Sequence, residues 1–287
     1  MGNRLYQSSY LADILKKFNF SFSKSLGQNF LIDGNIVKNI VSKSGITKDD
    51  IVLEIGPGFG TLTEELALNA KKVVSIEKDN RLMKVLDYTL KDFNNVKIIN
   101  EDFLKVDLKK IWEEEAEGKK FKVVANLPYY ITTPILEKII DNKELFSTIS
   151  VMVQEEVARR VVATKNSKDY GSLTLYLNYN SNPSILLKVP RTVFMPSPNV
   201  DSAILFLELQ KKQYAVDEKL LFDFIRSGFT KRRKNIVNSL TTGFVDVDKE
   251  TLRAILEELN ISKNARAENL SMEDFINITK KFQEVIK

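Results

Sequence analysis

IVLEIGPGFGTLTEEL, at residues 51–66, is the stretch that decides the fold of this chain. An apolar run, Ile51–Ile55, leads into closely spaced glycines and then into a helical pattern, which predicts a strand, a tight turn and a helix. Gly56, Gly58 and Gly60 can adopt positive φ and let a ligand approach the backbone, and the helix that follows offers free amide hydrogens. A purely structural tight turn would explain the same letters, so the turn alone does not establish a ligand.

Outward from this stretch, short apolar runs alternate with longer helical patterns as far as residue 153. The runs are Val73–Ile76, Val96–Ile99, Val123–Ala125 and Ile149–Val153, and the helical patterns are Glu64–Leu68, Arg81–Leu90 and Ile135–Ile140. Strands separated by helices predict an α/β fold in which a mostly parallel, Rossmann-like sheet is covered on both faces. Two later runs, Ile185–Val189 and Ala203–Leu209, are expected to form an antiparallel pair at one edge.

The pattern changes near both ends of the chain. After Leu209, the residues Lys211, Lys212 and Gln213 make a polar joint, and the segments beyond it look helical: Leu220–Phe229, Ile236–Leu240, Leu252–Leu259 and Phe275–Val285. We therefore predict a catalytic domain over residues 1–207 and a small helical domain over residues 208–287. Within residues 1–33, apolar side chains follow Ser8 and Ser9 at helical spacing and predict a short docked helix: Leu11, Ile14, Leu15 and Phe18.

The composition restricts the chemistry that this chain can carry out. Among 287 residues there are no cysteines and no histidines, which excludes disulfides, Cys/His zinc sites and every Ser-His or Cys-His triad, and we expect no metal. The formal charge of +5 is uneven, at +4 over residues 1–46, −1 over 47–205 and +2 over 206–287. Basic ends around a neutral middle suit a polyanion, although a solvated lysine-rich surface explains them equally well.

No apolar run approaches the length of a membrane span, and charges interrupt any secretion signal near the start of the chain. The interrupting residues are Asp13, Lys16 and Lys17. We therefore expect a cytoplasmic protein that does not associate with membranes.

Acidic residues follow the second and third predicted strands. Glu77 comes 21 residues after Gly56, where a carboxylate suits two ribose hydroxyls, and Asp102, beside Phe103, suits an adenine amine. Thr61 stands where the dinucleotide fingerprint would have its third glycine. Because the carboxyl ends of adjacent parallel strands meet at one edge, these positions predict a site for a ligand that contains a nucleoside. The series resembles class I methyltransferases that use S-adenosylmethionine.

The most specific motif is VVANLPYY at residues 123–130. The Asn126 side chain and the Leu127 carbonyl leave the fourth strand together, and Pro128 fixes the turn. Two adjacent acceptors can hold both hydrogens of an exocyclic amine and direct its lone pair at an electrophilic methyl, while Tyr129 can stack on the base. The alternative is an ordinary Asn-Pro turn with a surface tyrosine.

Several motifs agree in order and spacing with one family. Asn-Leu-Pro-Tyr resembles the motif of amino-methyltransferases that act on nucleic-acid bases, and the whole chain from about residue 20 resembles the small-subunit ribosomal RNA adenine dimethyltransferases of the KsgA type. The further matching segments are KSLGQNFLID at 24–33, FMPSPNVDSAI at 194–204, FTKRRKNIVNSL at 229–240 and ARAENLS at 265–271. Asn29 and Asn269 depart from the family, which often has His and Thr at these positions.

The resemblance implies a set of roles for named residues. It implies that S-adenosylmethionine is bound by the loop and strand-end positions Asn29, Leu31, Gly56, Gly58, Glu77, Asp102, Phe103 and Asn126. Asn126 and Leu127 would orient the target amine, with Tyr129 stacking on the adenine and Phe194 closing the other side.

The resemblance also implies a substrate and a product. Family members convert two adjacent adenosines in the loop of the 3′-terminal hairpin of 16S rRNA, in the 30S particle or its precursor, to dimethyladenosine. Four methyl transfers follow, each releasing S-adenosylhomocysteine, and the reaction serves small-subunit biogenesis. We expect the chain to act as a monomer.

Clustered cations are the candidates for contacting the phosphates of RNA. Lys231, Arg232, Arg233 and Lys234 are consecutive, Arg159 and Arg160 follow the fifth strand, and Lys24 lies beside the glutamine-asparagine segment. Four consecutive cations on a helix would spread around most of its circumference, so a solvated helix face is the alternative.

Two other functions compete with this interpretation. A sister enzyme that methylates large-subunit rRNA and confers macrolide resistance typically has isoleucine where Leu127 stands, and lacks the ARAENLS ending. A non-catalytic ribosome-assembly or transcription factor could share the scaffold, but the intact Asn126–Tyr129 motif and Glu77 argue against an inactive site. A small-molecule or protein methyltransferase would need neither the flanking cations nor the aromatic pair.

Overall fold

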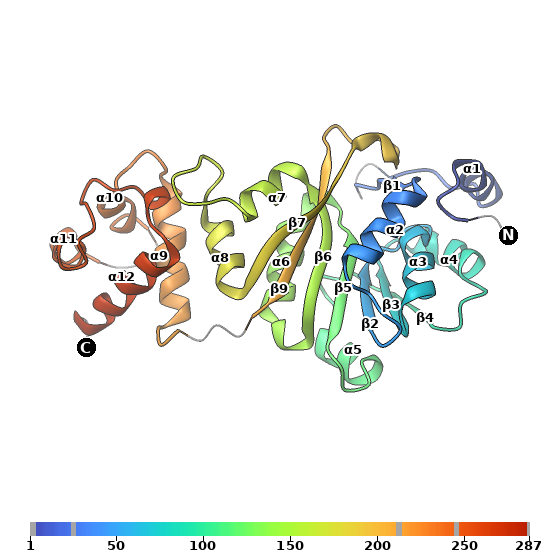
Figure 1. Cartoon of the computed structure of the whole chain (residues 1–287), viewed down its shortest axis with the longest axis horizontal. Coiled ribbons are helices and arrows are strands. Elements are labelled where there is room, and N and C mark those ends of the chain that lie inside the picture. The colour runs from blue at the N-terminus through green and yellow to red at the C-terminus, as the bar shows by residue number, and fades with distance from the viewer. Residues whose placement is uncertain (1–3, 24–26, 211–213, 244–246, 286–287) are drawn as a thin grey trace. The chain divides into compact units, whose positions relative to one another are not determined.

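The computed structural model of the chain describes residues 4–23, 27–210, 214–243 and 247–285 (Figure 1). The chain divides into two compact units, one joining residues 1–158 with 183–209 and the other joining 159–182 with 210–287. The second unit therefore includes residues 159–182, which the predicted boundary between 207 and 208 assigned to the first domain. The predicted polar joint at Lys211–Gln213 lies outside the described residues.

A mixed sheet forms the centre of the first unit. In the described part of the chain its strand order is β4-β3-β2-β5-β6-β9-β7. The strands are β2 (Ile51–Ile55), β3 (Lys72–Glu77), β4 (Val96–Asn100), β5 (Phe121–Asn126), β6 (Phe146–Gln154), β7 (Ser181–Val189) and β9 (Ser202–Leu209). Strands β2 to β6 pair in parallel, and β9 runs antiparallel to β6. The predicted α/β class, with a mostly parallel sheet and an antiparallel edge region, is confirmed.

Helices pack on this sheet through buried apolar faces. They are α2 (Gly34–Lys43), α3 (Thr61–Asn69), α4 (Met83–Thr89), α5 (Leu108–Glu115), α6 (Thr132–Asp141) and α7 (Glu155–Val161), which runs from the first unit into the second. One core cluster joins α2 and α3 to the sheet through side chains such as Val37, Leu66, Val52 and Val124. This core holds the strand ends and the glycine turn in fixed relative positions.

The N-terminal segment braces the glycine turn from outside the sheet. The predicted docked helix is present as α1 (Ser8–Lys17), but Gln7 occupies its N-cap position without a side-chain hydrogen bond, so the predicted serine cap is wrong. Beyond α1, the rings of Phe20 and Phe30 lie 5.0 and 4.4 Å from that of Phe59, which sits inside the glycine turn. The short strand β1 (Phe30–Leu31) then pairs antiparallel with β8 (Phe194–Met195).

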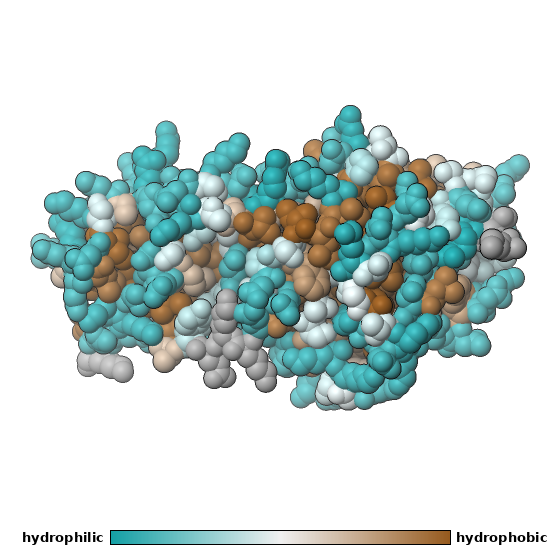
Figure 2. Space-filling view, in the orientation of Figure 1, coloured by the Kyte–Doolittle hydropathy of each residue, from teal (hydrophilic) through white to brown (hydrophobic). Residues whose placement is uncertain are grey.

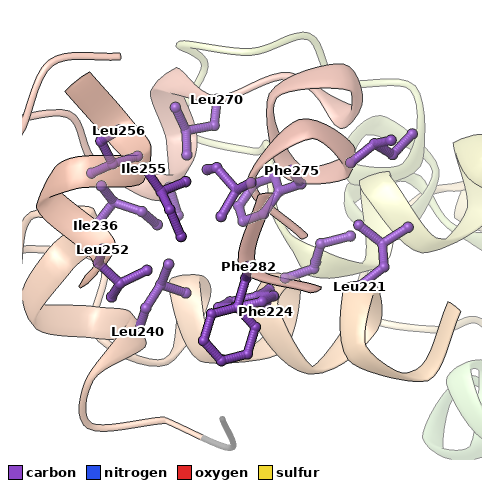
Figure 3. Packing of buried hydrophobic residues seen from close by; sticks show 14 of the residues in the cluster. Leu221, Phe224, Ile236, Leu240, Leu252, Ile255, Leu256, Leu270, Phe275 and Phe282 are labelled. Atoms are coloured by element: carbon purple, nitrogen blue, oxygen red, sulfur yellow. The ribbon is translucent and has the colours of Figure 1, made fainter. Parts of the chain in front are cut away.

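The second unit is helical and has its own core. It contains α8 (Ser172–Asn180), α9 (Glu218–Thr230), α10 (Ile236–Leu240), α11 (Lys249–Glu258) and α12 (Met272–Val285). Figure 3 shows apolar side chains from α9, α10, α11 and α12 pointing toward one another, among them Phe224, Leu240 and Phe275. Tyr170, Leu175 and Tyr179 belong to the same buried cluster, which explains why the segment 159–182 joins this unit.

The surface of both units is mostly polar in the view of Figure 2, with apolar side chains showing in patches between hydrophilic ones. Among the described residues, the longest apolar helical stretch falls short of what a membrane crossing requires.

Candidate functional site

A pocket opens at the carboxyl ends of four neighbouring strands of the first unit. Strands β2, β3, β4 and β5 end beside the glycine turn, Glu77, Asp102 and Asn126, and all of these line one cavity. The strand order β4-β3-β2-β5 brings together residues that are far apart in sequence. The pocket also receives Asn29 and Leu31 from the N-terminal segment, together with Phe103 and the whole turn from Leu127 to Ile131.

The glycine turn forms one wall of the pocket. Gly56 and Gly58 adopt φ of +71° and +61°, a conformation that side chains rarely accept. A Cβ on Gly58 would lie 2.6 Å from the Phe30 ring, so only glycine fits beneath the aromatic cluster. At the start of α3, Thr61 is 5% exposed and lines the pocket, and its hydroxyl has no partner among the described residues. That hydroxyl is a buried polar group that a ligand could satisfy.

Glu77 is held in place by backbone groups. Its Oε1 accepts a hydrogen bond from the Asp79 amide at 2.7 Å, and its Oε2 accepts one from the Gly58 amide at 3.3 Å. Burial raises the pKa of this carboxyl, and the backbone hydrogen bonds oppose the rise. The carboxylate therefore stands fixed at the end of β3, with its remaining acceptor capacity available to hydroxyl donors.

Asp102 is positioned in a similar way at the end of β4. Its Oδ1 accepts from the Leu104 amide at 3.0 Å, and its Oδ2 lies 2.9 Å from the Lys78 ammonium. Burial raises the pKa of Asp102, but the hydrogen bonds from Lys78 and the Leu104 amide and the nearby lysine charges together outweigh burial, so the pKa is lowered. The neighbouring Phe103 ring is buried, with the Lys138 ammonium 5.6 Å from its centroid. This corner combines a carboxylate with an apolar ring, as an adenine site requires.

The Asn126 side chain has a defined orientation. Its amide nitrogen donates to the Asn29 carbonyl oxygen at 2.8 Å, which leaves the amide oxygen to accept from a ligand. The next residue, Leu127, is buried, and its amide donates to the Met152 carbonyl at 3.3 Å. Pro128, with φ of −62°, begins the 3₁₀ turn Tyr129–Ile131. The Asn126 amide oxygen, a hydrogen-bond acceptor, therefore stands at the start of this turn, and the rings of Tyr129 and Tyr130 follow it.

The Tyr129 ring is anchored through its hydroxyl, which lies 2.7 Å from the Ser202 hydroxyl of β9. Burial raises the pKa of Tyr129, so the phenol stays neutral at physiological pH. A neutral ring fixed at its far end is suited to stacking on a planar heterocycle.

Phe194 is not brought into this pocket. Its side chain is 3% exposed, packs in the core cluster with Leu31, Met152 and Ile204, and does not line the cavity. Its burial follows from the pairing of Phe194 with Leu31 in the β1–β8 ribbon.

The predicted cationic residues belong to the second unit, except Lys24, which lies outside the described residues. Arg159 and Arg160 are exposed in the last turn of α7. Lys231 to Lys234 are also exposed, but they form the turn between α9 and α10, so the helical placement of these four cations is wrong. The reason is local: α9 ends at Thr230, and the Asn235 side chain caps the next helix by accepting from the Asn238 amide.

The four cations of this turn differ in whether they contact other residues of the protein. The Arg232 guanidinium donates to the carbonyls of Lys168 at 2.6 Å and Tyr170 at 3.3 Å, and lies 3.7 Å from Glu268. The Lys231 ammonium donates to the Thr242 hydroxyl at 3.2 Å. The side chains of Arg233 and Lys234 make no hydrogen bond or ion pair with any residue that the structure describes.

Among the pocket residues that the sequence does not identify as site residues, Thr61 and Tyr130 carry groups suited to a ligand. In the sequence, Thr61 appears only as the residue that replaces a glycine, and Tyr130 only as the end of the Asn-Leu-Pro-Tyr-Tyr segment. The signal for Thr61 is a hydroxyl at the first position of a helix that follows a glycine turn. The signal for Tyr130 is a second aromatic residue directly after Tyr129 in the 3₁₀ turn.

The chain was compared with known proteins. A family model described as "Ribosomal RNA adenine dimethylase" matches residues 19–284. Among curated relatives, "Ribosomal RNA small subunit methyltransferase A" of Alkaliphilus metalliredigens is 45% identical over 97% of this chain and 98% of its own length. The protein of the same name from Clostridioides difficile is 44% identical over 95% of each chain.

Solved structures also resemble this chain. A dimethyladenosine transferase from Plasmodium falciparum is 27% identical, with a TM-score of 0.75 over 89% of this chain and 98% of that one. The 23S rRNA methyltransferase ErmE is 28% identical, with a TM-score of 0.67 over 89% of this chain and 100% of that one.

Proposed function

The chain belongs to the ribosomal RNA adenine dimethylase family, and on that premise we propose which RNA it modifies and which residues carry the reaction. It is an adenine dimethyltransferase that uses S-adenosylmethionine. Its substrate is the 30S particle or its precursor, where it dimethylates N6 of two adjacent adenosines in the loop of the 3′-terminal hairpin of 16S rRNA. The full-length relatives that support this assignment carry the small-subunit name at 44–45% identity, whereas the 23S rRNA methyltransferase is 28% identical.

The pocket has the groups that this cofactor would need. The ribose hydroxyls would be held by Glu77, the adenine amine by Asp102 beside Phe103, and the amino-acid end by the glycine turn. The orphaned Thr61 hydroxyl is a further donor at that end, where Gly56 and Gly58 leave room for close approach. When bound, the cofactor supplies an electrophilic methyl group on a sulfonium.

The orientation of the Asn126 amide is the observation that carries the proposed mechanism. Its nitrogen is tied to the Asn29 carbonyl, so its oxygen accepts one hydrogen of the target amine, and the Leu127 carbonyl accepts the other. An exocyclic amine is a weak nucleophile because its lone pair is delocalised into the ring. Accepting both hydrogens favours a pyramidal nitrogen and turns its lone pair toward the methyl group, so the rate gain comes from positioning. Tyr129 stacks on the base.

The protein–RNA contact divides between the two parts of the chain. Residues 1–207 hold the cofactor and the target base, and residues 208–287 contribute phosphate contacts through Arg233 and Lys234, with Arg159, Arg160 and Lys24 as further cations. Phe194 covers the other face of the adenine only if the β1–β8 ribbon rearranges around the substrate, because its ring is buried in the free protein. The enzyme acts as a monomer in the cytoplasm, where ribosomal subunits assemble.

The test is a transfer assay with purified particles from a strain that lacks this modification. The protein is incubated with labelled S-adenosylmethionine and either 30S or 50S particles, and the labelled nucleotides are mapped. We expect label on 30S alone, at two adjacent adenosines, with up to four methyl groups for each particle. Label on 50S alone would assign the chain to the sister enzymes of the large subunit, and label on neither would favour a non-catalytic assembly factor.

A further inference from the structure

We propose that Tyr130 is a stacking platform for the nucleotide next to the target adenosine. The inference rests on the proposed function, because it names a second RNA contact at the same pocket. In the proposed substrate the neighbouring nucleotide is the other adenosine of the pair, so Tyr130 would hold one adenine while its partner lies against Tyr129.

The local backbone sends the two tyrosines in different directions. Both lie in the 3₁₀ turn Tyr129–Ile131, where successive residues are rotated by about 120° around the axis. Tyr129 turns toward the sheet and reaches the Ser202 hydroxyl. Tyr130 also lines the pocket, but its side chain is 55% exposed, so it stands at the mouth rather than in the interior.

The exposure of Tyr130 is unusual for this chain. Among the described residues the exposed large hydrophobic side chains are Leu68, Leu104, Tyr130, Val200, Tyr214 and Val285, and of these Tyr130 is the one that lines the pocket. The Lys78 ammonium interacts electrostatically with its hydroxyl, but no described residue hydrogen-bonds that hydroxyl, and burial does not explain why an aromatic ring stands there. A site that must receive a base does explain it.

The ring is supported from one side. A Cβ placed on Gly27 would lie 3.2 Å from Cδ1 of Tyr130 and 3.4 Å from Cε1, so the backbone at Gly27 lies close to one edge of the ring. Gly27 adopts φ of +59°, which a side chain would disfavour. Backbone near one edge of the ring leaves it fewer positions before RNA arrives, which lowers the entropy lost when a base stacks on it.

The chemistry of the substrate supplies the partner. An adenosine that enters the pocket leaves its stack, and the neighbouring base loses a stacking contact at that step. An aromatic ring at the mouth replaces that contact, and such stacking tolerates any base because each has a π face. Tyr130 would therefore strengthen binding of the substrate without touching the reacting amine.

The experiment compares Tyr130→Ala with Tyr130→Phe and with Leu68→Ala, a control that removes an exposed apolar side chain from α3 outside the pocket. For Tyr130→Ala we expect the KM for 30S particles to rise about 5- to 150-fold, the range that corresponds to losing one stacked base. Tyr130→Phe and Leu68→Ala should stay within about twofold of the wild type, since the first keeps the ring and the second leaves the mouth intact. The dissociation constant for S-adenosylmethionine and the thermal midpoint should be unchanged in all three.

A second arm identifies the stacked nucleotide. 30S particles are reconstituted with 16S rRNA in which one adenosine of the pair is replaced by an abasic nucleotide and the other remains the target. The abasic change should raise KM for the wild-type enzyme by the same factor as Tyr130→Ala, and should add nothing further in the Tyr130→Ala enzyme. Independent, multiplying effects would overturn the inference, as would an unchanged KM for Tyr130→Ala or a defect confined to cofactor affinity. Failure of the wild-type enzyme to methylate intact 30S particles would instead reject the proposed function itself.

Discussion

The pocket of the first unit and the turn at Lys231–Lys234 of the second differ in how far the protein has already engaged their polar groups. In the pocket, Glu77, Asp102 and Asn126 each hydrogen-bond to protein atoms that fix their orientation. In the turn, Arg232 is engaged with carbonyls of its own unit, while the Arg233 and Lys234 side chains are exposed and have no partner among the described residues.

This difference separates two tasks in one reaction. A pre-oriented, largely buried group acts strongly on a few atoms, so it can decide where a methyl group goes. An exposed cation on a flexible stem attracts phosphates at any sequence and is screened by salt, so it supplies affinity and no choice of base. Changes in the pocket should therefore affect chemistry or stability, whereas changes in the turn should affect binding and its salt dependence.

The largest effect is expected from Asn126→Ala, which removes the oriented acceptor from the pocket. The rate of transfer from bound complexes should fall by about 10²- to 10³-fold, the usual loss for one pre-organised polar group aimed at a reacting centre. Affinity for 30S particles should stay within about twofold of the wild type, because the cations are untouched. Single-turnover transfer and equilibrium binding of particles measure the two quantities separately.

Asn39→Ala serves as the matched control, since Asn39 is an exposed asparagine on α2, away from the pocket. It should leave both the rate and the affinity unchanged. Transfer by Asn126→Ala at near the wild-type rate would show that the amide does not orient the amine.

The second effect concerns Glu54, the most deeply buried acidic group that lines the pocket. Glu54 is 1% exposed, and its Oε2 accepts from the hydroxyls of Thr63 and Ser75, each at 2.7 Å. Burial raises its pKa from 4.5 to about 7, and the nearby Glu77 carboxylate adds to the rise. The folded protein therefore retains a proton that the unfolded chain releases, and stability falls as pH rises from the unfolded pKa through the folded one.

Glu54→Gln keeps an acceptor oxygen for both hydroxyls and removes the titration. Relative to the variant, the wild type should lose about 3 kcal/mol of unfolding free energy between pH 4 and pH 8, as a shift of this size implies. Urea unfolding at a series of pH values measures the difference. Glu114→Gln, at an exposed glutamate on α5, should follow the wild-type curve. Parallel curves for wild type and Glu54→Gln would mean that Glu54 is charged in the folded protein.

The part of the pocket that is formed by strand ends could be predicted from the sequence because its geometry follows from topology. Parallel strands present their carboxyl ends at one edge, which places Glu77 and Asp102 together, and both line the cavity with Gly56 and Asn126. The strands themselves were marked by continuous apolar runs, which buried parallel strands require.

The features that the sequence could not predict depend on long-range pairing. Phe194 is buried because its strand pairs with Phe30–Leu31, more than 160 residues earlier in the chain. No local sequence pattern predicts this pairing of β1 with β8. Arg232 donates to the carbonyls of Lys168 and Tyr170, some 60 residues away, so four consecutive cations in the sequence have different roles in the structure.

The smallest effect is expected from the exposed cations of the turn, because Arg232 is bonded to the protein whereas Arg233 and Lys234, without partners among the described residues, are free to contact phosphates. The double variant Arg233→Ala/Lys234→Ala should weaken binding to 30S particles about tenfold at physiological salt and reduce the slope of log affinity against log salt by about 2, one for each phosphate contact. Arg232→Ala should instead lower the unfolding free energy by about 1–2 kcal/mol, since it removes charged hydrogen bonds to carbonyls, and should leave the salt slope unchanged. Neither variant should alter cofactor affinity.

Titrations of particles at several salt concentrations measure the salt slope, and urea unfolding measures the change in stability. If all three cations reduced the salt slope equally, the bonds made by Arg232 would have to open on RNA binding, and the turn would act as one undivided patch.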